Sequence, residues 1–245
     1  MTSLGSVPTR RRRVRCVRLV AALVSVPVIG MPAPGTAAAP IPYRPDDKPF
    51  VYATGEHRPA HATTPLWSSY GSRSSTSRVV YLVGDSMAAQ HADGLRAATK
   101  SRGWGLKPRT RSGRPFVLPA TDSYNKGLYR QIHRDRARRP IVVLSGIRSS
   151  SAQLRATLWR LRYVGADVVF ATATTLSRTT SASSTAPMRA VAREKDVPLL
   201  ETDELADRGY VQKGVVVWRG VGNHTTGSFS RRILTWHDNK LIGSA

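Results

Sequence analysis

Two side chains that could form a hydrolytic site stand far apart in the sequence, Ser86 and His224. Ser86 follows a buried-strand run, residues 78–83, and precedes a helical pattern, so its hydroxyl is expected near backbone N–H groups that favour an oxyanion. A serine nucleophile needs a base. His224 lies in the loop-like stretch 222–226, the position most typical of a catalytic base among the six histidines. Two plainer interpretations stay open: Ser86 only caps a helix, and His224 is a surface histidine.

The segments that would position these residues alternate between strand and helix patterns after residue 77. Short apolar runs predict strands, and apolar residues at helical spacing predict helices. The predicted strands are 78–83, 104–109, 140–145, 167–172, 197–200 and 215–218, and the predicted helices are 87–102, 152–164, 187–195 and 226–237. This order indicates an α/β fold, a three-layer sandwich with a mostly parallel central sheet.

Functional groups in open α/β sheets collect at the carboxyl ends of the strands. In this chain that rule selects Ser86, Gly113 and the turn after Leu144. The sequence therefore predicts that one edge of the sheet carries the site.

The residues around Ser86 resemble the first motif of the SGNH (GDSL-type) hydrolases. Residues 83–90 read Val-Gly-Asp-Ser-Met-Ala-Ala-Gln, which is most similar to the SGNH domain fused to membrane acyltransferases that O-acetylate glycans. Further matches are residues 110–113, the strand 142–145, and Trp218-Arg219 followed by residues 223–225. The resemblance covers roughly residues 78–240 and implies the SGNH variant of the predicted sandwich, a flavodoxin-like arrangement.

The resemblance implies a role for several residues. Ser86 would be the nucleophile, His224 the base, and the backbone amides of Ser86 and Gly113 the oxyanion hole. The chain departs from the family at two positions: Arg148 stands where the family has an oxyanion-hole Asn, and Val221 where it has the acid that orients the histidine. Arg148 could itself donate to an oxyanion, although a long cation is less preorganised than a short amide.

Two groups could replace the missing acid. The main-chain carbonyl of Val221 could take the place of the carboxylate and accept a hydrogen bond from His224 Nδ1–H. Alternatively, Asp203 or Asp207 supplies a carboxylate from another loop. Both possibilities stay open at the level of the sequence.

The N-terminal part of the chain reads as an export signal followed by an arm. Residues 1–38 combine a basic run, an apolar stretch and the small residues Thr36-Ala37-Ala38, which predicts a cleaved signal peptide, with an uncleaved anchor as the alternative. Residues 39–77 are rich in Pro and Ser and predict a linker or loosely packed arm, which contains His57 and His61. The SGNH-like domain is expected over residues 78–245. We expect a secreted or cell-envelope protein with no membrane span after signal removal.

Composition limits the possible cofactors and partners. The single cysteine, Cys16, excludes a disulfide framework and a Cys-based zinc site, and we expect no metal and no cofactor. Without residues 1–38 the chain keeps 32 basic and 15 acidic residues, a net charge of +17. Because the arginines are scattered and the chain is expected to be exported, an anionic envelope polymer is a better partner than nucleic acid. A merely solvated basic surface is the alternative.

These observations lead to two functional hypotheses. The first is an exported SGNH-type serine esterase or acyl transferase that acts on O-acyl groups, in particular O-acetyl groups, of a cell-envelope glycan through an acyl-serine intermediate. The second is a catalytically weakened SGNH-fold protein that binds anionic wall polymer. Ser86 with His224 favours the enzyme, whereas Val221 and Arg148 favour the binding protein. A monomer is expected in both cases.

Overall fold

The computed structural model describes residues 44–146, 149–172, 178–206, 211–219 and 224–245. The expected signal peptide, residues 1–38, lies outside the described residues. The strands are β1 (His57–Arg58), β2 (Tyr70–Gly71), β3 (Val79–Gly84), β4 (Gly105–Arg111), β5 (Ile141–Ser145), β6 (Asp167–Ala171), β7 (Leu199–Leu200), β8 (Val211–Gln212) and β9 (Val215–Val216). The helices are α1 (Phe50–Ala53), η1 (Ala88–His91), α2 (Ala92–Ser101), α3 (Ser123–Arg134), η2 (Arg136–Arg138), α4 (Ser151–Tyr163), α5 (Arg178–Lys195), α6 (Thr202–Ala206), α7 (Gly227–Phe229), η3 (Ser230–Leu234) and α8 (Thr235–Gly243).

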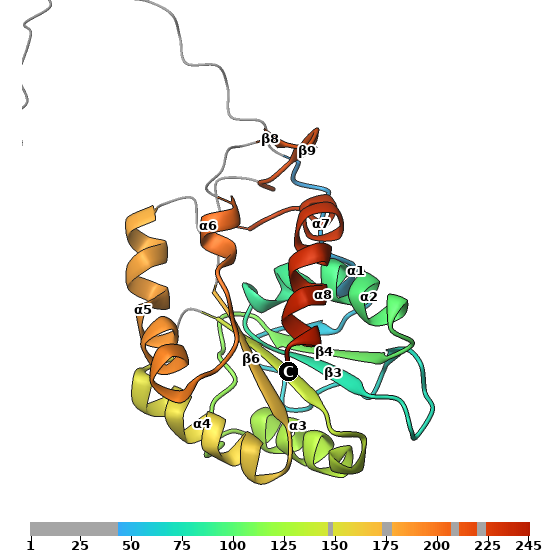
Figure 1. Ribbon diagram of the computed structural model, residues 1–245, viewed down its shortest axis with the longest axis vertical. Helices are drawn as coiled ribbons and strands as arrows, with labels where there is room; N and C mark the ends of the chain where they lie inside the picture. Colours follow the sequence, from blue (N-terminus) through green and yellow to red (C-terminus); the bar gives the residue numbers. More distant parts are fainter. Residues whose placement is uncertain (1–43, 147–148, 173–177, 207–210, 220–223) are drawn as a thin grey trace, which may run out of the picture. The chain divides into compact units, whose positions relative to one another are not determined.

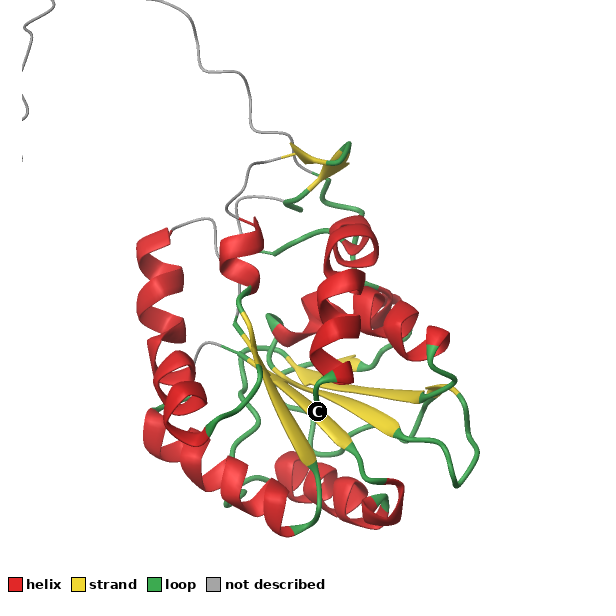
Figure 2. Cartoon of the chain, viewed as in Figure 1, coloured by secondary structure: helices red, strands yellow, loops and turns green. Residues whose placement is uncertain are grey.

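The central sheet is parallel except for one short strand. Its order is β1-β4-β3-β5-β6-β7, with every neighbouring pair parallel, and β2 pairs antiparallel with β4. Helices cover both faces, with α2 and α8 on one side and α3 and α4 on the other (Figures 1 and 2). The predicted three-layer α/β sandwich with a mostly parallel sheet is confirmed.

The middle strands form the centre of the fold because they are apolar on both faces. All six residues of β3 are buried, as expected for a parallel strand covered by helices on each side. Val80 and Leu82 pack into one core with α2 and α8, whereas Tyr81 and Val83 pack into the other with α3 and α4. The sheet therefore separates two cores, and its strand ends are held in a fixed position.

The segment expected to be an arm differs from that expectation. Residues 50–71 form α1, β1 and β2, and the side chain of Val51 has no exposed surface. β1 extends the sheet through parallel pairing with β4, with His57 opposite Thr110. A strand of two residues is too short to show a periodic apolar pattern, so β1 and β2 could not be predicted from the sequence. The boundary between arm and domain stays a prediction.

Two further differences concern helices. α3 was not predicted, although Tyr124, Leu128 and Ile132 are buried at helical spacing and Asp122 caps its first turn by accepting a hydrogen bond from Asn125 N at 2.9 Å. The predicted final helix is divided into α7, η3 and α8, where η3 is a π-helical segment. The strand predicted over residues 215–218 is shorter, and β9 forms a separate hairpin with β8.

Among the described residues, no helix combines the length and the apolar character that crossing a membrane requires.

Candidate active site

A sharp turn after β3 presents Ser86 at the carboxyl edge of the sheet. Gly84 ends the strand with φ +140°, and a Cβ atom there would lie 1.7 Å from the carbonyl oxygen of Ser145 on β5, so a side chain does not fit. The buried Asp85 closes the turn by accepting a hydrogen bond from Met87 N at 2.8 Å. The turn leaves Ser86 half-buried in front of η1.

The interpretation of Ser86 as a helix cap finds no support in these contacts. Met87 and His91 occupy the N-cap positions of η1 and α2, and neither helix has a side-chain cap. The Ser86 hydroxyl makes no hydrogen bond with any other residue in the described ranges. It is therefore available for a substrate, and hydrogen bonds of catalytic groups are often formed only once substrate is bound.

His224 lies on a short loop between two paired segments. Trp218 and Thr225 form an isolated antiparallel bridge, and Arg219 N donates a hydrogen bond to the His224 carbonyl at 2.9 Å. Thr226 then caps α7, because its Oγ1 accepts a hydrogen bond from Phe229 N at 3.0 Å. The half-buried His224 is thus held from both sides by backbone pairing and by a helix start.

Gln90 connects the Ser86 turn to the His224 loop. Its Oε1 accepts hydrogen bonds from Thr225 N at 3.2 Å and from Thr225 Oγ1 at 3.0 Å, and the side chain is 3% exposed. Gln90 belongs to the helical turn that follows Ser86, and Thr225 directly follows His224. The two segments that carry the predicted nucleophile and base, 138 residues apart, are therefore in direct contact through a buried side chain.

His57 belongs to the same edge of the sheet. Its Nδ1 lies 2.9 Å from Thr110 Oγ1, and its Nε2 lies 2.8 Å from Ser112 Oγ. Burial, followed by the nearby charges of His224 and Arg219, lowers the pKa of His57 to about 4. His57 is therefore neutral at pH 7 and shares its surroundings with the predicted base.

Sequence reasoning missed His57 because it placed this residue in an arm. The feature that brings His57 to the site is the parallel pairing of β1 with β4, between residues 53 positions apart. Thr110 and Ser112, whose hydroxyls contact His57, lie in a segment that resembles the family, but nothing in their spacing indicates a histidine partner. Only the sheet register reveals this contact.

The remaining predicted site residues fall into two groups. Gly113 lies in the turn after β4 with φ +59°, at the same sheet edge as Ser86, and its backbone amide as an oxyanion donor stays a prediction. Arg148 and Val221 lie outside the described residues, and so does Asp207. The structure therefore describes Ser86, His224 and Gly113 of the predicted set.

Asp203, the other candidate acid, has local partners. Its Oδ1 accepts a hydrogen bond from Thr172 Oγ1 at 2.6 Å, and its Oδ2 accepts one from Arg189 Nη2 at 2.6 Å. This ion pair joins α6 to α5 at the end of β6. The buried Asp203 carboxylate thus has a structural role as the ion-pair partner of Arg189.

No group of three His, Cys, Asp or Glu side chains suited to a metal ion occurs in the part of the chain that the structure describes.

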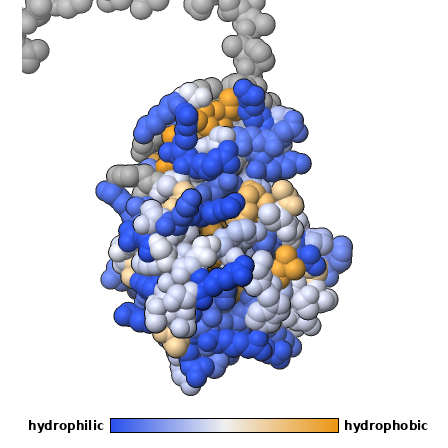
Figure 3. All heavy atoms as spheres, turned by 90° about the vertical axis from the view of Figure 1, so that its right-hand side faces the viewer, coloured by the Kyte–Doolittle hydropathy of each residue, from blue (hydrophilic) through white to orange (hydrophobic). Residues whose placement is uncertain are grey.

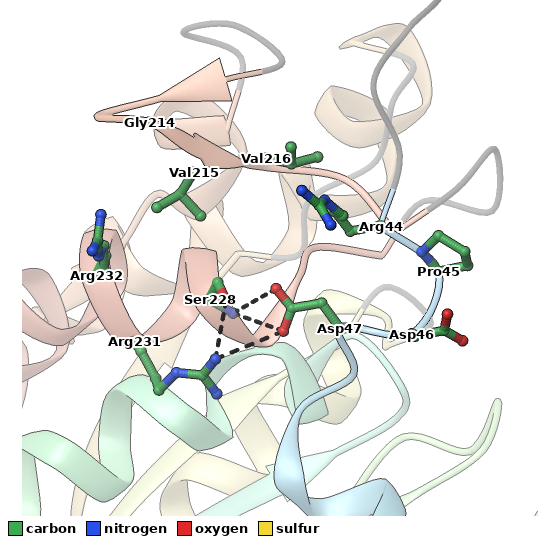
Figure 4. A pocket seen from close by; sticks show the side chains of 10 residues that line it. All are labelled: Arg44, Pro45, Asp46, Asp47, Gly214, Val215, Val216, Ser228, Arg231 and Arg232. Atoms are coloured by element: carbon green, nitrogen blue, oxygen red, sulfur yellow. Dashed lines mark hydrogen bonds and ion pairs between the residues drawn. The ribbon is translucent and has the colours of Figure 1, made fainter.

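A polar cavity of about 690 Å³ has a lining that includes neither Ser86 nor His224. Figure 4 shows arginines directed toward it from different elements, with Asp47 accepting hydrogen bonds from Ser228 N. Arg231 donates to Ser228 Oγ at 3.0 Å and to Asp93 Oδ1 at 3.0 Å. The lining residues are Arg44, Pro45, Asp46, Asp47, Gly214, Val215, Val216, Ser228, Arg231 and Arg232. This cavity is hydrophilic, which suits a charged ligand better than an acyl chain.

No protein-family model matches the sequence, and no curated protein matches it significantly. Among solved structures, the periplasmic domain of a lipopolysaccharide acetyltransferase from Salmonella ser. Paratyphi A is 15% identical, with a TM-score of 0.49 over 70% of this chain and 84% of that one. A member of the lipolytic protein G-D-S-L family from Veillonella parvula is 10% identical, with a TM-score of 0.44 over 69% and 100%.

A lipase/acylhydrolase from Enterococcus faecalis is 12% identical, with a TM-score of 0.46 over 69% of this chain and 96% of that chain. At such identities and TM-scores the likenesses assign no activity to this chain.

Proposed function

We propose that this protein is an exported serine esterase or acyl transferase of SGNH type, acting on O-acyl groups of a cell-envelope glycan. The observation that supports the proposal best is the buried hydrogen bonding of Gln90 to Thr225, which ties the Ser86 turn to the His224 loop. The half-buried hydroxyl of Ser86, which has no hydrogen-bond partner in the described ranges, is a second support.

The proposed reaction has two steps. In the first, His224 takes the proton of Ser86 Oγ as this oxygen attacks the acyl carbonyl carbon, and the sugar oxygen leaves with that proton. The negative charge on the carbonyl oxygen is stabilised by the backbone amides of Ser86 and Gly113. In the second, His224 takes a proton from the O–H group of an acceptor, whose oxygen attacks the acyl carbon, and Ser86 Oγ leaves that carbon with the proton from His224. Water as the acceptor completes an esterase cycle, and a sugar hydroxyl completes a transferase cycle.

The chain lacks two side chains of the family pattern, the acid that orients the base and the Asn of the oxyanion hole, so each needs a replacement. In the absence of an acid at Val221, the carbonyl of that residue is the proposed acceptor for His224 Nδ1–H. Arg148 is the proposed third donor to the oxyanion. Each assignment stays a proposal about residues outside the described ranges.

The competing function is a weakened SGNH-fold protein that binds anionic wall polymer. The observation that favours it is the arginine-lined cavity of about 690 Å³, together with the net positive charge of the chain. This alternative predicts polymer binding without turnover.

Hydrolysis of a chromogenic acetyl ester separates the two functions. Ser86→Ala is expected to reduce kcat by on the order of 10⁶, and His224→Ala by almost as much, because nucleophile and base act as one unit. Ser75→Ala is a matched control, since Ser75 is exposed, and we expect wild-type turnover from it. Wild-type protein without measurable turnover would favour the binding protein, whereas full turnover by Ser86→Ala would show that Ser86 is not the nucleophile.

A further inference from the structure

Arg219 carries a charge that the described residues leave without a counter-ion. Its Nε and Nη1 atoms are buried and have no hydrogen-bond partner, and no carboxylate of the described ranges forms an ion pair with it. The guanidinium lies 4.9 Å from the centre of the Tyr52 ring. A cation–π contact compensates only part of what a cation loses when it leaves water.

The two rings next to Arg219, Tyr52 and His57, add no negative charge. Tyr52 stays protonated at neutral pH because burial raises the pKa of its hydroxyl. Its ring also packs on His57, with ring centres 4.6 Å apart, and His57 is neutral at pH 7. The buried Asp85 carboxylate, whose charge acts on Tyr52, accepts a hydrogen bond from Met87 N at 2.8 Å and forms no ion pair with Arg219. Arg219 thus retains N–H donors and a positive charge.

The position of Arg219 places this charge next to the predicted base. Since Trp218 pairs with Thr225, the antiparallel register puts Arg219 directly opposite His224, and the backbone hydrogen bond of 2.9 Å confirms this pairing. Residues directly opposite in such a pair have Cβ atoms about 5 Å apart. The charges of both side chains also act on His57, and Tyr52 packs on both Arg219 and His57.

We propose that Arg219 is a specificity-determining residue that binds an anionic group, carboxylate or phosphate, of the substrate glycan beside the acyl group. The location of the acyl group rests on the proposed function, whereas binding of the anion does not require turnover. A bound anion would accept hydrogen bonds from the buried guanidinium and neutralise it. The substrate class is therefore an acidic or phosphorylated glycan rather than a neutral one.

Binding to the Ser86→Ala protein tests this proposal separately from catalysis. The ligands are trigalacturonate as the carboxylate, glucose 6-phosphate as the phosphate, and maltotriose as the neutral control, measured by isothermal titration calorimetry. We expect Arg219→Gln to weaken binding of at least one anionic ligand by tenfold or more, the size expected for hydrogen bonds to a charged group. The anion that responds identifies the source of the negative charge.

Two variants distinguish a binding site from a general effect. Arg73→Gln removes the same charge from an exposed arginine in the loop before β3, and we expect it to change anion binding less than twofold. Arg219→Lys keeps the charge and is expected to retain part of the affinity. Thermal unfolding is used to verify that each variant is folded. Equal losses from Arg219→Gln and Arg73→Gln, or no binding of either anion, would overturn the proposal. Full turnover by Ser86→Ala would instead refute the proposed function and leave this binding result standing.

Discussion

His57 couples the stability of the fold to pH at the scale of a single residue. In the folded protein its two ring nitrogens contact the hydroxyls of Thr110 and Ser112, and the ring is partly buried. Burial favours the neutral ring, and the charges of His224 and Arg219 act in the same direction, so the pKa falls from 6.5 to about 4. The His57 ring therefore binds a proton more weakly in the folded chain than in the unfolded chain.

Acidification from pH 7 to pH 5 should consequently destabilise the protein through His57. The unfolded histidine binds a proton below pH 6.5 and the folded one only near pH 4, so the stabilising contribution is complete above pH 6.5 and is lost as the pH falls toward 4. We expect a loss on the order of 1–2 kcal/mol, reduced from the full value because the ring is partly exposed. Urea unfolding at both pH values measures it.

His57→Gln serves as the control for this prediction. Its free energy of unfolding should fall less between pH 7 and pH 5 than that of the wild type. An equal decrease in both proteins would assign the pH dependence to other groups.

At the scale of elements, the site depends on contact between the turn after β3 and the loop before α7. Gln90 makes this contact, and its Oε1 accepts both hydrogen bonds from Thr225. Because Thr225 directly follows His224, movement of this threonine also moves the predicted base. Under the proposed function, in which His224 is the base, Gln90 would be a positioning residue that acts through the His224 loop.

Removing the acceptor should affect catalysis more than substrate binding. Gln90→Met leaves the Thr225 amide and hydroxyl buried without a partner, which should cost about 1–3 kcal/mol of stability. We expect kcat on a chromogenic acetyl ester to fall tenfold or more with KM changed less than threefold, because misplacement of a catalytic group acts on the reaction step.

Variants of Thr225 provide the matched test of this contact. Thr225→Val should reduce kcat as well, whereas Thr225→Ser, which keeps the hydroxyl, should retain most of the turnover. A rise of KM in Gln90→Met with kcat unchanged would show that Gln90 does not position the base.

The chain as a whole is strongly basic, and the face of the molecule in Figure 3 is largely hydrophilic. Hydrophilic side chains cover most of the face seen in Figure 3, and apolar patches on it are small. The net charge of +17 without residues 1–38 is spread through the chain rather than placed on one element. Such a surface attracts an anionic polymer over a broad area, with screened Coulomb attraction as the main force.

Retention on an anionic polymer should therefore depend steeply on salt. We expect the protein to bind a heparin resin at about 0.05 M salt and to elute below about 1 M, where the screening length is only about 3 Å. An uncharged dextran resin is the control and should not retain it. Retention that does not change between low and high salt would contradict the electrostatic account of polymer capture.

The local features of the fold follow from the sequence by itself. The apolar run that ends at Gly84 predicts a central strand, and the residues that follow predict a turn and a helix, since both signals lie within a few neighbouring residues. The same reasoning places His224 on a loop before the last helical segment. These patterns determine the sheet-forming segments and suggest the Ser86 and His224 pair.

The tertiary structure alone decided how distant segments complete the site. His57 joins the edge of the sheet through a strand of two residues, too short for any periodic pattern, whose partner Thr110 is 53 residues away. Gln90 meets Thr225 across 135 residues, and Arg219 lies opposite His224 because the backbone pairs the two residues. Such contacts depend on sheet register and on the packing of whole elements, and a register is set by the assembled fold rather than by the residues next to each partner.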